Sequence, residues 1–333
     1  MCMKKVQGYG ADLRALELFC GMGGFAAATA GSNLRVVGAF DQDQAALATY
    51  RLNFSDHVTR QVDLGRVGAW ELTAGGIDFW WLSPPCQPYC ERGVRRDLVD
   101  PRAHSLAHLI DLLGRMAEAV LPRHFALENV VGFVTSEAHR RLTEVLTSRG
   151  YHLQERLLCP TELGIPSRRP RYYLAASLET LRPVLPPATH TTRPLSSSLA
   201  LPENQHERAG LLMPPDILAR FGKGLHIIDP DDLGACTTCF TSGYGRSLKA
   251  SGSYLQCAGG VRRFSPEEIV RLLHFPEGFR FPGELSLRQR WSLVGNSLSV
   301  AAVREVLRAF PALQLDVAAQ PPQPCSVLSR AKR

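Results

Sequence analysis

The chain has 333 residues, of which 45% are hydrophobic and 21% charged, a balance that excludes disordered and fibrous proteins. Its 38 basic and 31 acidic residues give a net charge of +7, and 33 of the basic residues are arginines. Arginine binds phosphate in a forked geometry, so a polyanionic partner is expected, although a compositional bias of the source would give the same count. No apolar stretch reaches the ~18 residues that cross a bilayer. We expect a soluble cytoplasmic protein with no membrane partner.

The nine cysteines are scattered and odd in number, which is not the pattern of a disulfide framework. Cys236 and Cys239 have the spacing of half a zinc site, but a second pair would have to come from Cys86 and Cys90. That pairing would consume a candidate nucleophile. The sequence therefore predicts no metal site.

A cofactor turn is predicted near the start of the chain. A short apolar strand over 15–19 leads into the glycine-rich segment 20–25 and then into a run of alanines, the order typical of a nucleotide-binding turn. The spacing is not that of the dinucleotide motif Gly-x-Gly-x-x-Gly. A second strand, 35–40, ends at Asp41, where a carboxylate can accept hydrogen bonds from ribose. The alternative role of Asp41 is to cap a helix over 42–53.

The stretch Ser83-Pro84-Pro85-Cys86-Gln87-Pro88 follows the apolar run 77–82, which is typical of a buried strand. Open α/β sheets bind their ligands at the carboxyl ends of such strands. We therefore interpret Cys86 as a candidate nucleophile, the alternative being a small apolar filler. The arginines that follow, Arg92, Arg95, Arg96 and Arg102, are expected to contact phosphates or to form a solvated loop.

A carboxyl group ends the next predicted strand, 124–127. Glu128 emerges from an apolar strand, so its pKa should be raised and it could donate a proton near neutral pH. The alternative is a helix-capping acid. Helices are expected over 106–119 and 137–149, and strands over 152–159 and from Arg171 onward.

The domain division follows from composition. We expect a catalytic domain over 1–183, a linker and target-recognition domain over 184–290, a helix over 291–310 that returns to the catalytic domain, and a frayed tail over 311–333. The segment 181–215 is rich in Pro, Ser and Thr and should be a linker. The returning helix should start near Asn296 to Ser299, because Gly295-Asn296-Ser297 supplies a cap and 300–310 has helical spacing. A further helix is expected over 266–274.

The ordered motifs are more specific together than alone. They are Phe19-Cys20-Gly21-Met22-Gly23-Gly24, Pro84-Pro85-Cys86-Gln87-Pro88, Glu128-Asn129-Val130, Arg169-Pro170-Arg171 and Gly295-Asn296-Ser297. In this order they resemble the motifs of the cytosine-5 methyltransferases. Cys239-Phe240-Thr241, with Gly243-Tyr244-Gly245 behind it, resembles the signature of the branch that modifies tRNA at cytosine-38. The resemblance implies the Rossmann-like doubly wound α/β fold of the class I S-adenosylmethionine-dependent methyltransferases, with a smaller target-recognition domain.

The resemblance also implies residue roles. Cys86 would be the nucleophile, Glu128 the acid that contacts the base, and Arg169 and Arg171 the residues that orient the cytosine. S-adenosylmethionine, and S-adenosylhomocysteine as product, would be surrounded by Phe19, Met22, Gly23, Gly24, Asp41, Asp63, Leu64, Ser83, Asn296 and Ser297. Substrate contacts would come from Gln87, Asn129, Arg92, Arg95, Cys239, Phe240 and Thr241. Cys90 stands where the family pattern leads us to expect Thr or Ser.

The chemistry explains these residue types. Carbon 5 of cytosine is a poor nucleophile, so a thiolate first adds to carbon 6 and makes carbon 5 electron-rich. We expect a monomeric enzyme that acts on tRNA, with aspartate tRNA as the first choice and glutamate tRNA as the second. A DNA cytosine-5 methyltransferase is the main alternative. An amino-group methyltransferase would need an aromatic residue where Cys86 stands, and a non-catalytic binding module would be expected to lose Cys86 or Glu128.

Overall fold

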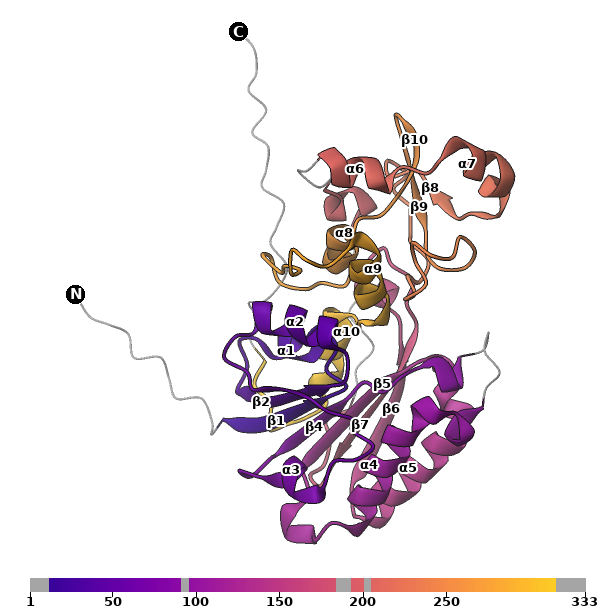
Figure 1. Ribbon diagram of the computed structural model, residues 1–333. Coiled ribbons are helices and arrows are strands. Elements are labelled where there is room, and N and C mark those ends of the chain that lie inside the picture. Colours follow the sequence, from indigo (N-terminus) through magenta and orange to yellow (C-terminus); the bar gives the residue numbers. More distant parts are fainter. Residues whose placement is uncertain (1–11, 91–95, 184–192, 201–204, 316–333) are drawn as a thin grey trace, which may run out of the picture.

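A mostly parallel sheet forms the larger part of the molecule (Figure 1). The computed structural model describes residues 12–90, 96–183, 193–200 and 205–315. The seven strands follow the order β3-β2-β1-β4-β5-β7-β6, and β7 runs antiparallel to both of its neighbours. The strands are β1 (Leu13–Leu18), β2 (Leu34–Asp41), β3 (Thr59–Gln61), β4 (Phe79–Leu82), β5 (His124–Asn129), β6 (His152–Leu158) and β7 (Arg171–Ser177). The expected doubly wound α/β fold is confirmed.

Helices cover both faces of this sheet, and the central strand β4 shows why. Successive side chains of a strand point to opposite faces. Phe79 and Trp81 accordingly lie in one hydrophobic core, and Trp80 and Leu82 lie in the other. The first core contains α1 (Gly24–Thr29), α2 (Gln44–Asn53) and α10 (Val300–Leu307), and the second contains α3 (Ala69–Thr73), α4 (His104–Arg115) and α5 (Glu137–Ser148). A strand buried on both faces is a continuous apolar run.

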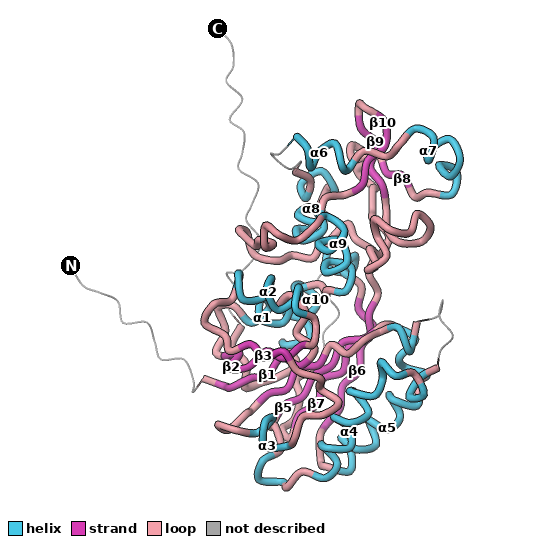
Figure 2. The backbone as a smooth tube through the Cα atoms, in the orientation of Figure 1, coloured by secondary structure: helices cyan, strands magenta, loops and turns pink. Residues whose placement is uncertain are grey.

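A smaller part lies beyond the edge of the sheet where β4 and β5 end (Figures 1 and 2). It contains α6 (Gln205–Leu211), α7 (Pro215–Phe221), α8 (Pro266–Leu272), α9 (Leu287–Asn296) and a three-stranded sheet of β8 (Ile227–Ile228), β9 (Tyr254–Cys257) and β10 (Gly260–Arg263). Its buried residues Phe240, Tyr254 and Trp291 belong to the same hydrophobic core as Phe25 of α1. The two parts are therefore packed together through one core.

The returning helix begins where the sequence predicts: α10 starts at Val300, and the hydroxyl of its cap, Ser299, accepts from Ala302 N. Other expectations about the second half of the chain are wrong in detail. The residues 291–296 belong to a separate helix, α9. The residues 295–297 instead end α9. The expected linker contains α6, and its Leu195 and Leu211 are fully buried.

The beginning of the expected tail is also ordered. Asn33 Nδ2 donates to Ala312 O at 3.1 Å, and Leu315 forms a bridge with Ser32. Residues 316–333 lie outside the described part. Within the described ranges, no helix has both the length and the apolar character needed to cross a bilayer.

Candidate active site

The loop after β4 is held at three points. Ser83 N donates to Leu18 O at 3.2 Å, and the Ser83 hydroxyl accepts from Trp81 Nε1 at 2.8 Å. Asn129 Nδ2, at the end of β5, donates to Pro84 O at 3.4 Å. These contacts fix the half-buried Cys86 thiol at the carboxyl edge of the sheet, as the sequence predicts.

The reversed direction of β7 brings an arginine to the same edge. Since β7 is antiparallel to β5, the residue that opens β7 lies beside the residues that end β5. Arg171 Nε stands 3.2 Å from Glu128 Oε1, and Arg171 Nη2 stands 3.6 Å from Cys239 Sγ. Arg171 thus joins the carboxyl group of one strand to a thiol of the smaller part.

Burial controls the charge of these groups. It raises the pKa of the Glu128 carboxyl, and the guanidinium groups of Arg171 and Arg169 oppose that shift without cancelling it. Burial also acts to raise the pKa of Cys239, but Arg169 and Arg171 outweigh it and the pKa is lowered. The edge therefore combines a carboxyl group whose pKa is raised with a thiol whose pKa is lowered.

Arg169 connects the sheet to the smaller part of the molecule. Its Nη1 donates to Cys239 Sγ at 3.4 Å and to Phe240 O at 3.0 Å, and its Nη2 donates to Gly295 O at 3.2 Å and to Ser297 O. The side chain is 5% exposed. These contacts occupy both terminal nitrogens, so Arg169 aligns other segments around the site.

Gly295 makes a close contact within the smaller part, between α9 and the Thr241 segment. A Cβ added there would lie 2.2 Å from the carbonyl carbon of Thr241, so only glycine fits. The Thr241 hydroxyl accepts from Gly243 N at 3.3 Å. The Phe240 ring is 5.0 Å from that of Tyr244 and lies in the core, so its side chain has no free face toward a base.

Cys86 and Cys90 flank the 3-10 turn Gln87–Tyr89. The influence of Cys86 lowers the pKa of Cys90 to about 7, and the influence of Cys90, together with burial, raises the pKa of Cys86. All seven cysteines in the described ranges are free thiols. In those same ranges, no three His, Cys, Asp or Glu side chains are grouped to hold a metal.

The glycine-rich turn lies beside Asp41. Gly21 N donates to Asp41 Oδ2 at 2.8 Å, and Asp43 N donates to Asp41 Oδ1 at 2.9 Å. Gly21 has a φ of +53° and no atom within 4 Å of the place where a Cβ would stand, so its outer side is open. A Cβ on Gly23 would lie 2.4 Å from the Phe54 ring. Gly23 therefore serves packing, and Gly21 leaves space for a ligand.

The alternative role for Asp41 as a helix cap is wrong. Helix α2 is capped by Asp43, whose Oδ1 accepts from Ala45 N at 2.8 Å and from Ala46 N at 3.2 Å. Asp41 ties the glycine turn to the end of β2 instead.

A buried acid behind the turn was missed by the sequence interpretation. Glu17 Oε1 accepts from Phe25 N at 3.1 Å, and Glu17 Oε2 accepts from the Tyr50 hydroxyl at 3.0 Å. The same hydroxyl lies 3.0 Å from His57 Nδ1. Burial raises the pKa of Glu17 to about 8. The available signal was a lone glutamate inside the apolar run 15–19.

The other predicted cofactor residues are dispersed around the turn. Met22 and Leu64 are buried in different cores, so their side chains pack within the protein. Asp63 Oδ1 accepts from Gly65 N at 2.9 Å, and Phe19 has a φ of +58° just after β1. Asn296 is exposed at the end of α9. Met22 and Leu64 are thus packed inside the protein, whereas Asp63 and Asn296 are exposed.

The residues that were predicted to bind the substrate lie in different surroundings. Gln87 follows Cys86, and its buried Oε1 has no partner among the described residues. Asn129 is buried and supports the cysteine loop. Arg92 and Arg95 lie outside the described residues.

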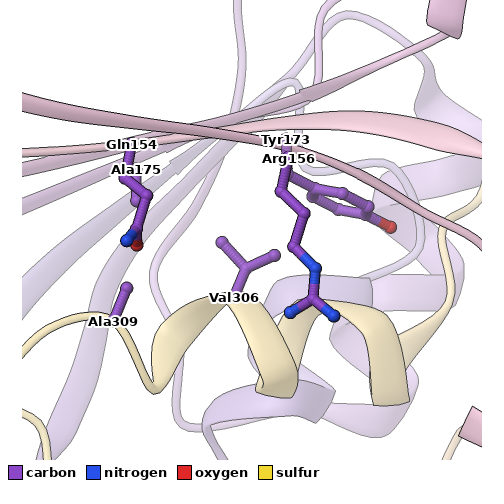
Figure 3. A pocket seen from close by; sticks show the side chains of 6 residues that line it. All are labelled: Gln154, Arg156, Tyr173, Ala175, Val306 and Ala309. Atoms are coloured by element: carbon purple, nitrogen blue, oxygen red, sulfur yellow. The ribbon is translucent and has the colours of Figure 1, made fainter. Parts of the chain in front are cut away.

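A small cavity lies away from this edge, between strands β6 and β7 and helix α10 (Figure 3). It measures about 10 Å³ and is lined by Gln154, Arg156, Tyr173, Ala175, Val306 and Ala309. That volume holds one water molecule. Gln154 Oε1 has no partner among the described residues and could bind that water, so the cavity is not a cofactor site.

Known proteins are similar to this chain both in sequence and in fold. Residues 13–212 match the family of C-5 cytosine-specific DNA methylases. The human tRNA (cytosine(38)-C(5))-methyltransferase is 29% identical over 390 aligned residues, which cover 89% of this chain and 98% of the human protein.

Two solved structures are similar throughout. The Entamoeba histolytica methyltransferase EhMeth superposes with a TM-score of 0.81 at 25% identity, covering 90% of this chain and 98% of that chain. The Schizosaccharomyces pombe Dnmt2 methyltransferase superposes with a TM-score of 0.78 at 26% identity, covering 89% and 97%. The family match spans the glycine turn, the Cys86 loop, Glu128 and Arg171. This chain therefore belongs to the C-5 cytosine-specific DNA methylase family.

Proposed function

We propose that this protein transfers a methyl group from S-adenosylmethionine to carbon 5 of cytosine-38 in the anticodon loop of a tRNA. The observation that carries the proposal is the meeting of Cys86, Glu128 and Arg171 at one edge of the sheet. A thiol, a carboxyl group that can carry a proton and a guanidinium are the groups that cytosine activation requires.

The proposed mechanism begins at Cys86. Its thiolate forms a covalent bond to carbon 6 of the cytosine, and Glu128 donates a proton or a hydrogen bond to ring nitrogen 3 as charge develops there. Arg171 holds Glu128 through its 3.2 Å contact. After methylation, water takes the proton of carbon 5 and the electrons of that C–H bond form the carbon 5–carbon 6 double bond. The carbon–sulfur bond breaks with its electron pair leaving on Cys86, and Glu128 takes back the proton of nitrogen 3. Arg169 keeps Cys239 and the end of α9 in place during these steps.

The residues around the glycine turn fit S-adenosylmethionine, which supplies the activated methyl group when bound. The open side of Gly21 gives the backbone a close approach to a ligand. Asp41 retains acceptor capacity for ribose hydroxyls beside its two backbone contacts. Ser83 and the 296–297 segment would close the site.

The choice of tRNA over DNA rests on the smaller part of the molecule. Cys239-Phe240-Thr241 lies against Arg169, Arg171 and Gly295, so this signature contributes to the site. An anticodon loop presents unpaired bases, which reduces the cost of bringing cytosine out of its stack. The relatives whose names specify tRNA cytosine-38 cover nearly the whole chain. Aspartate tRNA is our first choice and glutamate tRNA the second.

DNA is the second candidate substrate because the matched family is described by DNA methylation. A transfer assay with tritium-labelled S-adenosylmethionine should offer total tRNA and genomic DNA in parallel, followed by bisulfite sequencing of the labelled species. We expect label at tRNA cytosine-38. Preferential labelling of DNA would contradict the substrate and leave the Cys86 mechanism intact.

The remaining proposals concern organisation. We propose a catalytic domain over 1–183 with 291–310, a recognition domain over 184–290, a monomeric state and a cytoplasmic location. Light scattering on the purified protein and imaging of a fluorescent fusion would test the last two.

A further inference from the structure

The buried carboxyl group of Glu17 joins three elements behind the glycine turn. It belongs to β1, its Oε1 accepts from Phe25 N of α1 at 3.1 Å, and its Oε2 lies 3.0 Å from the Tyr50 hydroxyl of α2. Helices α1 and α2 lie on the same face of the sheet (Figure 1). Residues 20–23 link β1 to α1, so this carboxyl group ties together the two elements on either side of the turn.

Tyr50 connects this carboxyl group to a histidine nearer the surface. The Tyr50 hydroxyl lies 3.0 Å from His57 Nδ1. Tyr50 is fully buried and His57 is half-buried. The Phe54 ring stacks on His57, with the centroids 5.7 Å apart, and the same ring would meet a Cβ placed on Gly23. The chain of Glu17, Tyr50 and His57 therefore runs from the buried side of the turn toward solvent.

The Tyr50 hydroxyl can satisfy both of its neighbours in two ways. A hydroxyl donates one hydrogen bond, so one neighbour must donate to it. In the first arrangement a protonated Glu17 donates to Tyr50, and Tyr50 donates to His57 Nδ1. In the second, Tyr50 donates to an ionised Glu17, and a proton on His57 Nδ1 is donated to Tyr50. The carboxyl group can therefore gain or lose its proton without leaving a buried polar group unpaired.

The charges near Glu17 keep both forms accessible. Burial raises its pKa to about 8, the negative charge of Asp41 adds to the rise, and the hydrogen bonds from Tyr50 and Phe25 oppose it. Burial likewise raises the pKa of the Cys20 thiol in the turn. Both hydrogen-bonding partners of the carboxyl group are uncharged. A positive charge brought into the turn would therefore shift Glu17 toward its ionised form.

The other end of the chain stays neutral. Burial lowers the pKa of His57, the charge of Arg35 adds to that effect, and the charge of Asp56 opposes it. His57 therefore does not keep a second proton. A proton that arrives at Nδ1 is balanced by the loss of the proton on Nε2 to water.

We propose that Glu17, Tyr50 and His57 let the glycine turn distinguish S-adenosylmethionine from S-adenosylhomocysteine by their charge. This role rests on the proposed function. The methyl donor has a sulfonium and therefore one more positive charge than the product. With that charge in the turn, Glu17 gives its proton to the Tyr50 oxygen, and the hydroxyl proton of Tyr50 passes to His57 Nδ1. Once the methyl group has left, the extra charge is gone and Glu17 takes a proton back by the same route.

This arrangement favours the exchange of product for donor. An ionised Glu17 attracts the donor, whereas a neutral Glu17 gives the product no such attraction. Glu17 acts through charge from behind the turn, so it determines specificity and is not a catalytic residue. Glutamine at position 17 keeps an acceptor for Phe25 N and a donor for Tyr50 but cannot ionise. The Glu17→Gln variant therefore separates the effect of charge from that of packing.

The first test counts protons. Calorimetric titration of the full chain at about pH 7.5, in phosphate and in Tris, gives the protons released on binding, because the two buffers differ in ionisation enthalpy. The excess released with S-adenosylmethionine over S-adenosylhomocysteine should be about half a proton larger in the wild type than in Glu17→Gln. Glu155→Gln is the matched control and should behave like the wild type, because Glu155 also contacts a tyrosine and a histidine, Tyr172 and His139, but lies on β6.

The second test follows the ratio of the two dissociation constants with pH. The ionised form of Glu17 predominates at higher pH, so the preference for S-adenosylmethionine should rise about fivefold from about pH 6.5 to about pH 8.5, relative to Glu17→Gln. Tyr50→Phe removes a hydrogen bond that favours the ionised form, so the rise should begin at higher pH. Tyr151→Phe, whose hydroxyl donates to Pro122 O, is the matched control and should show the wild-type profile.

The outcomes are distinguishable. A proton excess and a pH profile that are the same in Glu17→Gln as in the wild type would overturn the proposal. If the wild type binds neither ligand, the proposed function fails and this role fails with it. If it binds both ligands with equal proton release, the cofactor assignment stands and only the discrimination by charge is wrong.

Discussion

Two regions of the molecule are built in different ways. One is the cofactor turn, residues 20–25 with Asp41, and the other is the catalytic edge, where Cys86, Glu128 and Arg171 meet. The turn is made of β1, α1 and β2, and the hydrogen bonds of its acids, Asp41 and Glu17, join residues at most 33 positions apart, such as Tyr50 and Glu17. The catalytic edge joins residues as far apart as Arg169 and Ser297, separated by 128 positions. The turn is therefore a local construction held by backbone amides, whereas the edge depends on the assembly of the whole molecule. Substitutions in the two regions should therefore impair different properties of the protein.

The largest effect is expected at the edge, from Cys86→Ser. The change is nearly isosteric but replaces a good nucleophile with a weak one, so methyl transfer should fall by roughly 10³-fold or more. Calorimetric binding of S-adenosylhomocysteine should remain within about twofold, because the turn is a separate construction. With an RNA that contains 5-fluorocytosine, the wild type should form a covalent adduct at Cys86. An adduct that maps to Cys90 or Cys239 would contradict the assignment.

Arg169→Leu should remove the long-range contacts that hold the catalytic edge together. The substitution leaves the carbonyl groups of Phe240, Gly295 and Ser297 without their donor, so the free energy of unfolding should fall by about 3 kcal/mol. Urea titration measures this loss. Arg168→Leu is the matched control, because Arg168 is exposed. Equal stability of the two variants would show that the long-range contacts do not hold the edge together.

Asp41→Ala should weaken cofactor binding at the turn and leave the catalytic edge unchanged. We expect S-adenosylhomocysteine to bind about tenfold more weakly, which is ~1.4 kcal/mol, with methyl transfer restored by excess S-adenosylmethionine. Asp43→Ala is the control: it removes the cap of α2 and should cost about 1 kcal/mol of stability without changing affinity. Weaker binding in Asp43→Ala than in Asp41→Ala would contradict the role given to Asp41.

The smallest effect concerns the pH dependence of the turn. The pKa of Glu17 is about 8 in the folded state and about 4.5 when unfolded, so its contribution to stability is complete below pH 4.5 and is lost as the pH rises through 8. From about pH 7 to about pH 8, the wild type should lose about 1 kcal/mol from this group. Glu17→Gln, which mimics the protonated acid, should lose less in thermal melts at both pH values. The same dependence of stability on pH in both proteins would contradict the raised pKa of Glu17.

The difference between the regions also explains what the sequence could predict. The glycine turn, Asp41, Cys86 and Glu128 all lie at or just beyond the ends of apolar strands, so their presence at one edge followed from local patterns. Arg171 was predicted in role through a family resemblance, but its contact with Glu128 depends on the reversed direction of β7. Local patterns do not encode strand direction.

Two further features were missed for a related reason. Glu17 is a charged residue in an apolar strand, and only its distant partner Tyr50 explains it. The role of Gly295 as a helix cap is wrong, because what requires glycine there is close contact with the backbone of Thr241. Both depend on contacts that only the folded chain creates.

The position of α10 has a consequence for protein synthesis. Leu298, just before α10, fills the space above Gly24, and Arg304 Nη1 donates to Ala28 O and Ala30 O at 3.1 Å each. Within the described residues, α1 is the first helix to leave the ribosome, and it is covered by α10, the last one. Until residue 307 has emerged, the face of the sheet around Phe25 stays exposed on the nascent chain, which makes the polypeptide a substrate for chaperones during translation. A stop codon before α10 should yield a product that is degraded rather than a shortened enzyme.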